Sequence, residues 1–387
     1  MGLPNSSNKA ARIFIGLLDS RRRMLPALRS GTGAAAGRYH TSSPAPRARN
    51  RMPASTESTP LPGRRIYTFA DSGAGLRAVL IIDGMSDRIA AGGTRTRTYP
   101  SLEAAVTDAG ELARAMSLKA AIAGVGTAGA KMVVMDHDGL DREAAFRALG
   151  RHVQSMAGTF YTAGDLGTTV DDLLAMAETT EFVTTREPEL GDAVGRGVRA
   201  CAAACARARG HEGLAGLRVA IQGCGAMGVG VARAMAEAGT ELLVANVNAE
   251  AASAVAAETG AQVVAPEDIL AADADIVAPC AIGGALTDEA IDAMRAWAVC
   301  GAANNVLADQ TGAARLRSRD IMFVPDFLAS AGALIAGICE IRGSAQAENL
   351  IEALGTTTTE VLARSVERDI TTTAAATAIA AEKSPSS

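Results

Sequence analysis

The sequence contains few aromatic residues and very few lysines. Aromatic residues make up 3% of the 387 residues, with a single tryptophan. Of the 37 basic residues only four are lysines, namely Lys9, Lys119, Lys131 and Lys383, so nearly all of the positive charge is carried by arginine. Arginine stays protonated, whereas a buried lysine can lose its proton. The positions that keep lysine are therefore candidates for chemistry.

The chain is also poor in the patterns that build metal sites, disulfide frameworks and membrane spans. Its six cysteines form no CxxC pair, and its four histidines are scattered. This spacing argues against a metal site and a disulfide framework and fits a reducing compartment, so we expect a cytoplasmic protein. No stretch of 18 uncharged apolar residues occurs, so we expect no membrane partner.

Positive charge is concentrated near the start of the chain. Residues 1–60 contain ten basic and two acidic residues, and since the whole chain has a net charge of −5, about −13 remains on the rest. Such an acidic remainder argues against nucleic-acid binding. The Arg- and Ser-rich segment is typical of an organellar transit peptide or a disordered extension, and Met52 is a third candidate as the true start. We favour an extension or an early start, because this composition builds no core.

The remaining sequence predicts an α/β fold with two domains and C-terminal helices. From about residue 210 to 330, short β-branched runs such as RVAIQ alternate with Ala-rich helical windows, which indicates a doubly wound parallel sheet. Residues before 195 mix strands such as AKMVVMD with helices, and the sequence after 335 is helical. We expect four segments: an extension at 1–62, an α/β domain at 63–195, a doubly wound domain at 196–335, and helices packing back at 336–387.

A glycine motif predicts a dinucleotide site in the doubly wound domain. The sequence Gly223-Cys224-Gly225-Ala226-Met227-Gly228 has the GxGxxG pattern and lies between the strand LRVAIQ and the helix VGVARAMAEAG. The glycines permit a tight turn, close approach of a pyrophosphate and close packing of helix on strand. A strand before the motif and a helix after it are the context that a Rossmann domain requires.

Asn246 stands 18 residues after Gly228, where an acidic residue commonly binds the adenosine ribose. An asparagine can hydrogen-bond a ribose hydroxyl but does not repel a 2′-phosphate. No arginine follows within the next few residues to bind that phosphate. We therefore expect NAD as the cofactor, with NADP not excluded.

Several stretches between about residue 78 and 340 are distinctive, and they read AAGGTRTRTYPSLEAAVTDAGELARAMSLKAAIAG, FYTAGDLGTTVDDL, GCGAMGVGVA, APCAIGGALT, CGAANNVL and FVPDFLASAGAL. In this order they resemble the glutamate/leucine/phenylalanine/valine dehydrogenase superfamily, most closely its leucine/phenylalanine branch. The resemblance implies that residues 63–195 form the substrate domain and that the protein is a homo-oligomer acting on a small amino acid or 2-oxo acid.

The resemblance also implies roles for single residues. Lys119 would pair with the substrate α-carboxylate, and Lys131 would be the catalytic lysine, which needs a depressed pKa to work as a base. Asp165 would exchange protons with the substrate amine. Gly92 and Asn305 would approach the substrate, and the nicotinamide ring would lie beside Asn305 and Ala281.

The chain departs from the family pattern at several positions. The glycine-rich run before Lys131 reads Ala128-Gly129-Ala130, and Ser330 replaces an expected asparagine. The residues aligned with the side-chain pocket are apolar and mostly small, namely Ala91, Ala163, Leu334 and Gly337. Such a pocket is suited to a bulky aliphatic or aromatic side chain and not to glutamate.

We therefore expect an NAD-dependent L-amino acid dehydrogenase that reversibly converts an apolar amino acid into a 2-oxo acid and ammonium. The alternative is a cofactor-binding homologue with weak or altered activity on a modified amino acid in specialised metabolism. A hydroxy-acid oxidoreductase is disfavoured by the two lysines and by the lack of a candidate catalytic histidine.

Overall fold

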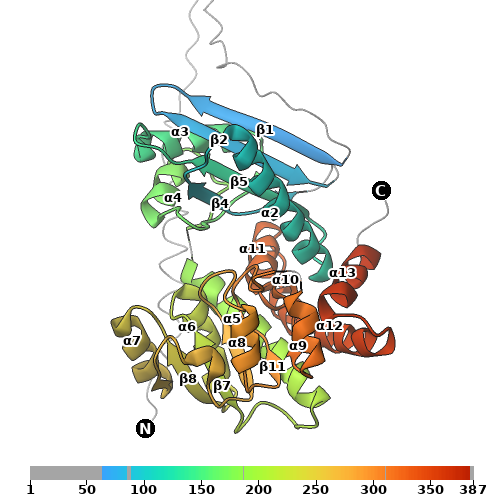
Figure 1. Ribbon diagram of the computed structural model, residues 1–387. Coiled ribbons are helices and arrows are strands. Elements are labelled where there is room, and N and C mark those ends of the chain that lie inside the picture. Colours follow the sequence, from blue (N-terminus) through green and yellow to red (C-terminus); the bar gives the residue numbers. More distant parts are fainter. Residues whose placement is uncertain (1–62, 85–88, 186, 310, 384–387) are drawn as a thin grey trace, which may run out of the picture. The chain divides into compact units, whose positions relative to one another are not determined.

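The computed structural model describes residues 63–84, 89–185, 187–309 and 311–383, so the expected extension at 1–62 lies outside the described residues. These residues form two six-stranded sheets covered by helices (Figure 1). The predicted α/β class with a Rossmann domain and C-terminal helices is confirmed. No helix of the described residues is long and apolar enough to cross a membrane.

The first sheet has the strand order β1-β2-β5-β3-β6, and β4 also pairs with β5. Its strands are β1 (Arg64–Asp71), β2 (Leu76–Asp83), β3 (Ala90–Ala91), β4 (Thr94–Arg97), β5 (Ala128–Met135) and β6 (Phe160–Tyr161). The accompanying helices are α2 (Leu102–Ile122), α3 (Arg142–Ser155) and α4 (Val170–Ala177). The strands β3, β4 and β6 are too short to have been predicted from alternation.

Strand β5 lies at the centre of this sheet and presents two different faces. Ala128, Ala130, Met132 and Val134 belong to the core that also contains residues of α3 and α4, whereas Val133 packs with residues of α2. Successive side chains of a strand alternate between faces. Gly129 and Lys131 therefore lie on the face that α2 covers.

The second sheet is entirely parallel, with the order β12-β11-β10-β7-β8-β9. Its strands are β7 (Arg218–Gln222), β8 (Glu241–Ala245), β9 (Gln262–Val263), β10 (Ile276–Pro279), β11 (Ala298–Val299) and β12 (Met322–Phe323). Strand order reverses between β7 and β10, and in doubly wound sheets the ligand crevice lies outside the carboxyl ends of the strands at such a switch point.

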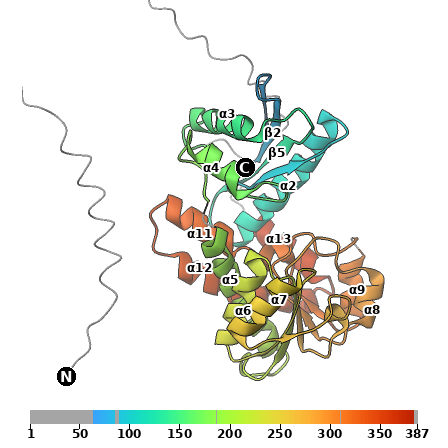
Figure 2. The ribbon, with the colours of Figure 1, turned by 90° about the vertical axis from the view of Figure 1, so that its left-hand side faces the viewer.

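Helices cover both faces of the second sheet (Figure 2). One face carries α5 (Glu187–Ala208), α6 (Ala226–Glu237) and α7 (Ala249–Thr259), and the other carries α8 (Asp288–Ala293) and α9 (Gly312–Ser318). Helices α5 and α6 touch backbone to backbone, because a Cβ on Gly195 would lie 2.0 Å from the carbonyl oxygen of Gly230. The expected boundary between residues 195 and 196 falls inside α5.

The chain ends with α10 (Asp326–Ala329), α11 (Gly332–Ile341), α12 (Ala347–Glu367) and α13 (Thr372–Lys383). The expected boundary between residues 335 and 336 falls inside α11. These helices contact the first half of the chain: Arg342 donates hydrogen bonds to the carbonyl oxygens of Val125 and Gly126, and Lys383 lies 3.5 Å from that of Ile122. They thereby hold the end of α2 and the loop that leads to Lys131.

Candidate active site

Lys131 lies in a buried cluster of charged side chains on the α2 face of the first sheet. Its Nζ is 2.8 Å from Oδ2 of Asp165, and Nε of Arg95 donates to the same oxygen, also at 2.8 Å. The exposed fractions of the three side chains are 8%, 22% and 16%. Arg95 pairs with Val133 in the β4–β5 register, which places it on the same face as Lys131. The structure thus brings Lys131 and Asp165 together. It adds Arg95 to them, which the sequence analysis did not predict.

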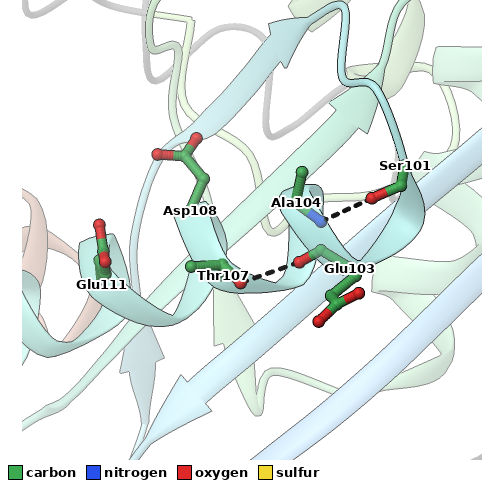
Figure 3. A pocket seen from close by; sticks show the side chains of 6 residues that line it. All are labelled: Ser101, Glu103, Ala104, Thr107, Asp108 and Glu111. Carbon is green, nitrogen blue, oxygen red and sulfur yellow. Dashed lines mark hydrogen bonds between the residues drawn. The ribbon is translucent and has the colours of Figure 1, made fainter.

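Asp108 of α2 closes the far side of this cluster. Each of its carboxylate oxygens accepts a hydrogen bond from Nη1 of Arg95 at 3.3 Å, and the Tyr99 hydroxyl also donates to Asp108. Asp108 also lines a polar surface hollow on α2, beside Thr107 and Glu111 (Figure 3). The charges therefore alternate from Lys131 through Asp165 and Arg95 to Asp108.

The cluster changes the pKa values of its members. Burial lowers the pKa of Lys131, Asp165 opposes this effect, and the charge of Arg95 lowers the value further. Burial alone would raise the pKa of Asp165, but Lys131 and Arg95 together hold it below its usual value. The carboxylate thus stays ionised while the amine becomes easier to deprotonate, which suits a general base.

Lys119 lies near the C-terminal end of α2 and is also buried. Its amine donates to Oδ1 of Asn304 at 2.9 Å and to Oγ of Ser330 at 2.8 Å. Burial lowers the pKa of Lys119 to about 8, and the charge of Lys131 contributes, whereas Asp326 and Asp165 oppose the shift. An ammonium has three donors, so one remains for a ligand.

Asn305 and Ser330 both hydrogen-bond Asp326. Asn305 has a positive φ of 50°, and its backbone N–H, not its side chain, is bound by Asp326. The neighbouring Asn304 supplies the side chain that contacts Lys119. Ser330, which stands where asparagine was expected, also bonds Lys119 and donates to the carbonyl oxygen of Asp326 at 2.6 Å.

Two glycines next to the site allow close backbone packing. A Cβ on Gly92 would lie 1.6 Å from the carbonyl oxygen of Ala130, and one on Gly129 would lie 2.1 Å from the backbone nitrogen of Ser117. Ala128 and Ala130 point into the opposite core. The replacement of glycine by alanine at these two positions therefore does not change the surface that carries Lys131.

The residues expected to line the side-chain pocket are only partly enclosed. Ala91 is buried, whereas Ala163, Leu334 and Gly337 are partly exposed. Ala91 and Leu334 belong to one apolar cluster. A Cβ on Gly337 would meet no atom within 4 Å, so this position leaves open space.

The glycine motif adopts a tight turn between β7 and α6. Gly223 has a φ of 100°, and a Cβ there would lie 2.9 Å from Ala281, which follows β10. A Cβ on Gly228 would lie 1.9 Å from the carbonyl oxygen of Gly223, so helix and turn are in contact. Gly225 is the N-cap residue of α6, and no atom lies within 4 Å of its Cβ position. Ala226 and Met227 lie in the first turn of that helix, whose N-cap makes no side-chain hydrogen bond. The backbone N–H groups of a first helical turn, next to open space, are the features that pyrophosphate binding requires.

Asn246 directly follows β8 and contacts this turn. Its Oδ1 accepts the backbone N–H of Cys224 at 3.2 Å, and its Nδ2 donates to the carbonyl oxygen of Asn248 at 3.1 Å. The carboxamide therefore connects the glycine turn to the start of α7.

Sequence reasoning missed four members of the lysine site: Arg95, Asp108, Asn304 and Asp326. One signal was available for Asp108, because it precedes Lys119 by 11 residues, or three helical turns, and so shares its side of α2. Arg95 and Asp326 lie within the matched stretches but required the sheet register and the position of α10 to be recognised.

Family models match most of the described chain. Residues 76–182 match the Glu/Leu/Phe/Val dehydrogenase dimerisation domain, and residues 242–384 match the Glutamate/Leucine/Phenylalanine/Valine dehydrogenase model.

Relatives match over most of their length. The chain is 36% identical to a leucine dehydrogenase of Bacillus cereus over 326 residues, which is 81% of this chain and 88% of the relative. It is 34% identical to a valine dehydrogenase of Streptomyces virginiae, covering 82% and 93% of the two chains. The crystal structure of L-tryptophan dehydrogenase from Nostoc punctiforme is 31% identical, covers 83% and 96%, and has a TM-score of 0.72. The chain therefore belongs to the glutamate/leucine/phenylalanine/valine dehydrogenase family.

Proposed function

We propose that the protein is an NAD-dependent L-amino acid dehydrogenase that acts on a bulky apolar amino acid. The observation that carries this proposal is the pair of buried lysines, one bonded to a carboxylate and the other with a donor to spare. A base that works near neutral pH and a cation that binds a carboxylate are the two groups that oxidative deamination needs.

Lys119 is the proposed binding group for the substrate α-carboxylate. Asn304 and Ser330 occupy two of its donors and so fix the direction of the third. A carboxylate there replaces solvent and restores charge balance around a buried ammonium, which raises the pKa of Lys119 again. The positive charge is thus stabilised by the substrate that it binds.

Lys131 and Asp165 are the proposed catalytic residues. The neutral amine of Lys131 takes a proton from the water that attacks the substrate imine, and Asp165 receives or returns the amine proton as ammonia leaves. Both groups must be held close for this exchange, as their 2.8 Å contact provides.

The turn at Gly223, Gly225 and Gly228 is the proposed pyrophosphate site, and Ala281 is the proposed neighbour of the nicotinamide. A bound nicotinamide supplies the two-electron oxidant for the substrate Cα–H bond. We favour NAD over NADP, because Asn246 offers no cation for a 2′-phosphate. Discrimination should be modest, since Asn246 also carries no negative charge.

The open space at Gly337 supports a large substrate side chain. The similarity to proteins named leucine, phenylalanine, valine and tryptophan dehydrogenases supports an apolar substrate. The match to a dimerisation domain supports a homo-oligomer, which light scattering on a size-exclusion column would test.

The test is a panel of L-amino acids assayed with NAD and with NADP by the absorbance of reduced nicotinamide. We expect reduction with leucine, phenylalanine or tryptophan, slower reduction with valine, and none with glutamate or D-amino acids. The Gly337→Val variant should lose the largest substrates by about 10- to 200-fold while keeping valine, since one misfitting methylene group costs about 1–3 kcal/mol.

Dinucleotide binding without reduction by any amino acid of the panel would overturn the proposal. That outcome would favour the alternative of a cofactor-binding homologue acting weakly or on a modified amino acid. Reduction with glutamate alone would contradict the assigned pocket.

A further inference from the structure

Arg95 contacts two carboxylates, that of Asp165 in the proposed catalytic pair and that of Asp108 next to it. Its Nε donates to Oδ2 of Asp165 and its Nη1 to both oxygens of Asp108. Lys131 donates to the same Oδ2 of Asp165, and among the described residues no group hydrogen-bonds the other oxygen. The two contacts to Oδ2, from Arg95 and Lys131, hold the carboxylate of Asp165 in place. Its other oxygen, Oδ1, is left for the substrate.

The arrangement matters most when Lys131 is neutral. A lysine acting as a base must first lose its proton, and Asp165 then loses the charge of one of its two cations while remaining largely buried. A buried carboxylate without a cation takes up a proton or moves. Arg95 cannot deprotonate, so it remains charged through the whole cycle.

We infer that Arg95 is a positioning residue of the reaction, which holds Asp165 ionised and in place while Lys131 gives up and regains its proton. This inference rests on the proposed function. It adds a permanent cation, with Asp108 as its support, to the pair that exchanges protons.

The packing leaves little room for another arrangement. A Cβ on Gly93 would lie 3.1 Å from Cβ of Asp165 and 3.3 Å from Nζ of Lys131, so the backbone between β3 and β4 touches both groups. Arg95 emerges from the start of β4, two residues later. Its guanidinium reaches Asp165 with one edge and Asp108 with the other, which the single amine of a lysine cannot do.

The charged groups that face Lys131 come from β4, α2 and the loop after β6, and they act in opposite directions. Asp165 and Asp108 raise its pKa, whereas Arg95 lowers it; Lys119 of α2 is a further cation, and its own pKa is lowered by Lys131. Removing Arg95 should therefore raise the pKa of Lys131, and removing the charge of Asp108 should lower it. A purely structural role for the two residues would not give shifts of opposite sign.

The experiment compares kcat/KM against pH for the wild type, Arg95→Gln and Asp108→Asn, with Arg97→Gln as the control. Arg97 lies two residues further along the same strand and is exposed. We expect the ascending limb to move to higher pH in Arg95→Gln and to lower pH in Asp108→Asn, and to stay unchanged in Arg97→Gln. At a pH below the ascending limb, kcat/KM should fall about tenfold for each unit by which the limb moves to higher pH.

A second readout does not depend on activity. Because the chain has only four lysines, ¹³C labelling of lysine Cε gives at most four signals from side chains, and the Lys131 signal is the one that Lys131→Arg removes. The pH at the titration midpoint of the Lys131 signal should rise in Arg95→Gln and fall in Asp108→Asn.

The two readouts separate the possible failures. If the wild type reduces no cofactor with any amino acid, the proposed function fails, and the NMR titration alone decides the role of Arg95. If Arg95→Gln is folded and binds cofactor like the wild type but keeps the wild-type limb and midpoint, the inference is wrong. If Arg95→Gln does not fold, Asp108→Asn decides, and an unchanged midpoint there also overturns it.

Discussion

The two halves of the proposed active site are built by opposite means. The lysine site consists of charged side chains, namely Lys131, Asp165, Arg95 and Asp108, which are largely withdrawn from solvent and bonded to one another. The glycine turn at residues 223–228 depends mainly on close backbone contacts, and the side chains that connect it to the end of β8 are the neutral Asn246 and Cys224.

This difference shows how each half should respond to mutation. In the lysine site, the proposed function depends on proton affinities, so removing a charge should change rate and pH dependence more than binding of the dinucleotide. In the glycine turn, the proposed function depends on the absence of side-chain atoms, so adding one methyl group should change affinity and leave proton transfer alone. Three experiments test this contrast.

Lys131→Ala should give the largest effect. Without the proposed base, reduction of nicotinamide by a good amino acid substrate should fall by at least about 10²- to 10⁴-fold, which is the usual contribution of general acid–base catalysis. Dinucleotide affinity, measured by quenching of protein fluorescence or by calorimetry, should stay within a few-fold of the wild type. Lys383→Ala removes a lysine whose amine hydrogen-bonds Thr357 and the Ile122 carbonyl, and it should keep wild-type turnover. Unimpaired turnover in Lys131→Ala would refute the assignment.

Gly228→Ala should give an intermediate effect on the other half. Its Cβ would lie 1.9 Å from the carbonyl oxygen of Gly223, so α6 must move away from the turn. Overpacking of this kind costs about 1–3 kcal/mol, and each 1.4 kcal/mol that reaches the binding step weakens dinucleotide affinity about tenfold.

Gly213→Ala is the control for that experiment, because Gly213 lies in the loop before β7 and outside the proposed pyrophosphate site. No atom lies within 4 Å of the Cβ position of Gly213, and its φ is not positive. Its affinity in the same calorimetric titration should change less than that of Gly228→Ala. The reverse order would mean that the close contact between helix and turn does not govern binding.

The smallest effect concerns the pH dependence of substrate binding. Burial lowers the pKa of Lys119 to about 8, so the charged form that binds a carboxylate is present below this pH and is lost as the pH rises above it. The KM for amino acid should therefore rise above about pH 8, by at most about tenfold per unit.

Lys119→Arg tests this cause directly, because arginine stays protonated over the whole range. Its KM should be higher overall, since the guanidinium has a different shape, but should change less between pH 8 and pH 10. The substrate amine titrates identically in both proteins. Equal slopes for the two would assign the pH dependence to another group.

Much of the fold was predictable because it depends on local patterns. The strands RVAIQ and AKMVVMD and the amphipathic helices between them have lengths and periodicities that determine their type. The two-residue strands β3 and β6 were not predictable, since β3 exists only through its pairing with β5 and β6 only through its pairing with β3. The helix α5 spans the expected boundary between domains and packs closely on α6 through Gly191 and Gly195. This packing is a tertiary contact, so the sequence pattern alone did not reveal it.

The site was predictable only in part. Lys119, Lys131 and the three glycines were visible because their residue types are rare or their spacing is diagnostic. Asn305 was named from the sequence, whereas the neighbouring Asn304, whose side chain contacts Lys119, was not. Adjacent positions in a loop point in different directions, and only the backbone conformation, with a positive φ at Asn305, distinguishes them.

The sequence by itself determined the class of the fold, the position of the dinucleotide turn and the two lysines, because each depends on local composition or short-range spacing. The tertiary structure decided which groups control those lysines. Arg95, Asp108 and Asp165 are separated by 13 to 70 residues along the chain and meet because β4, α2 and the loop after β6 converge on one face of β5. The charge balance of a buried amine depends on such neighbours in space, and no local pattern records it.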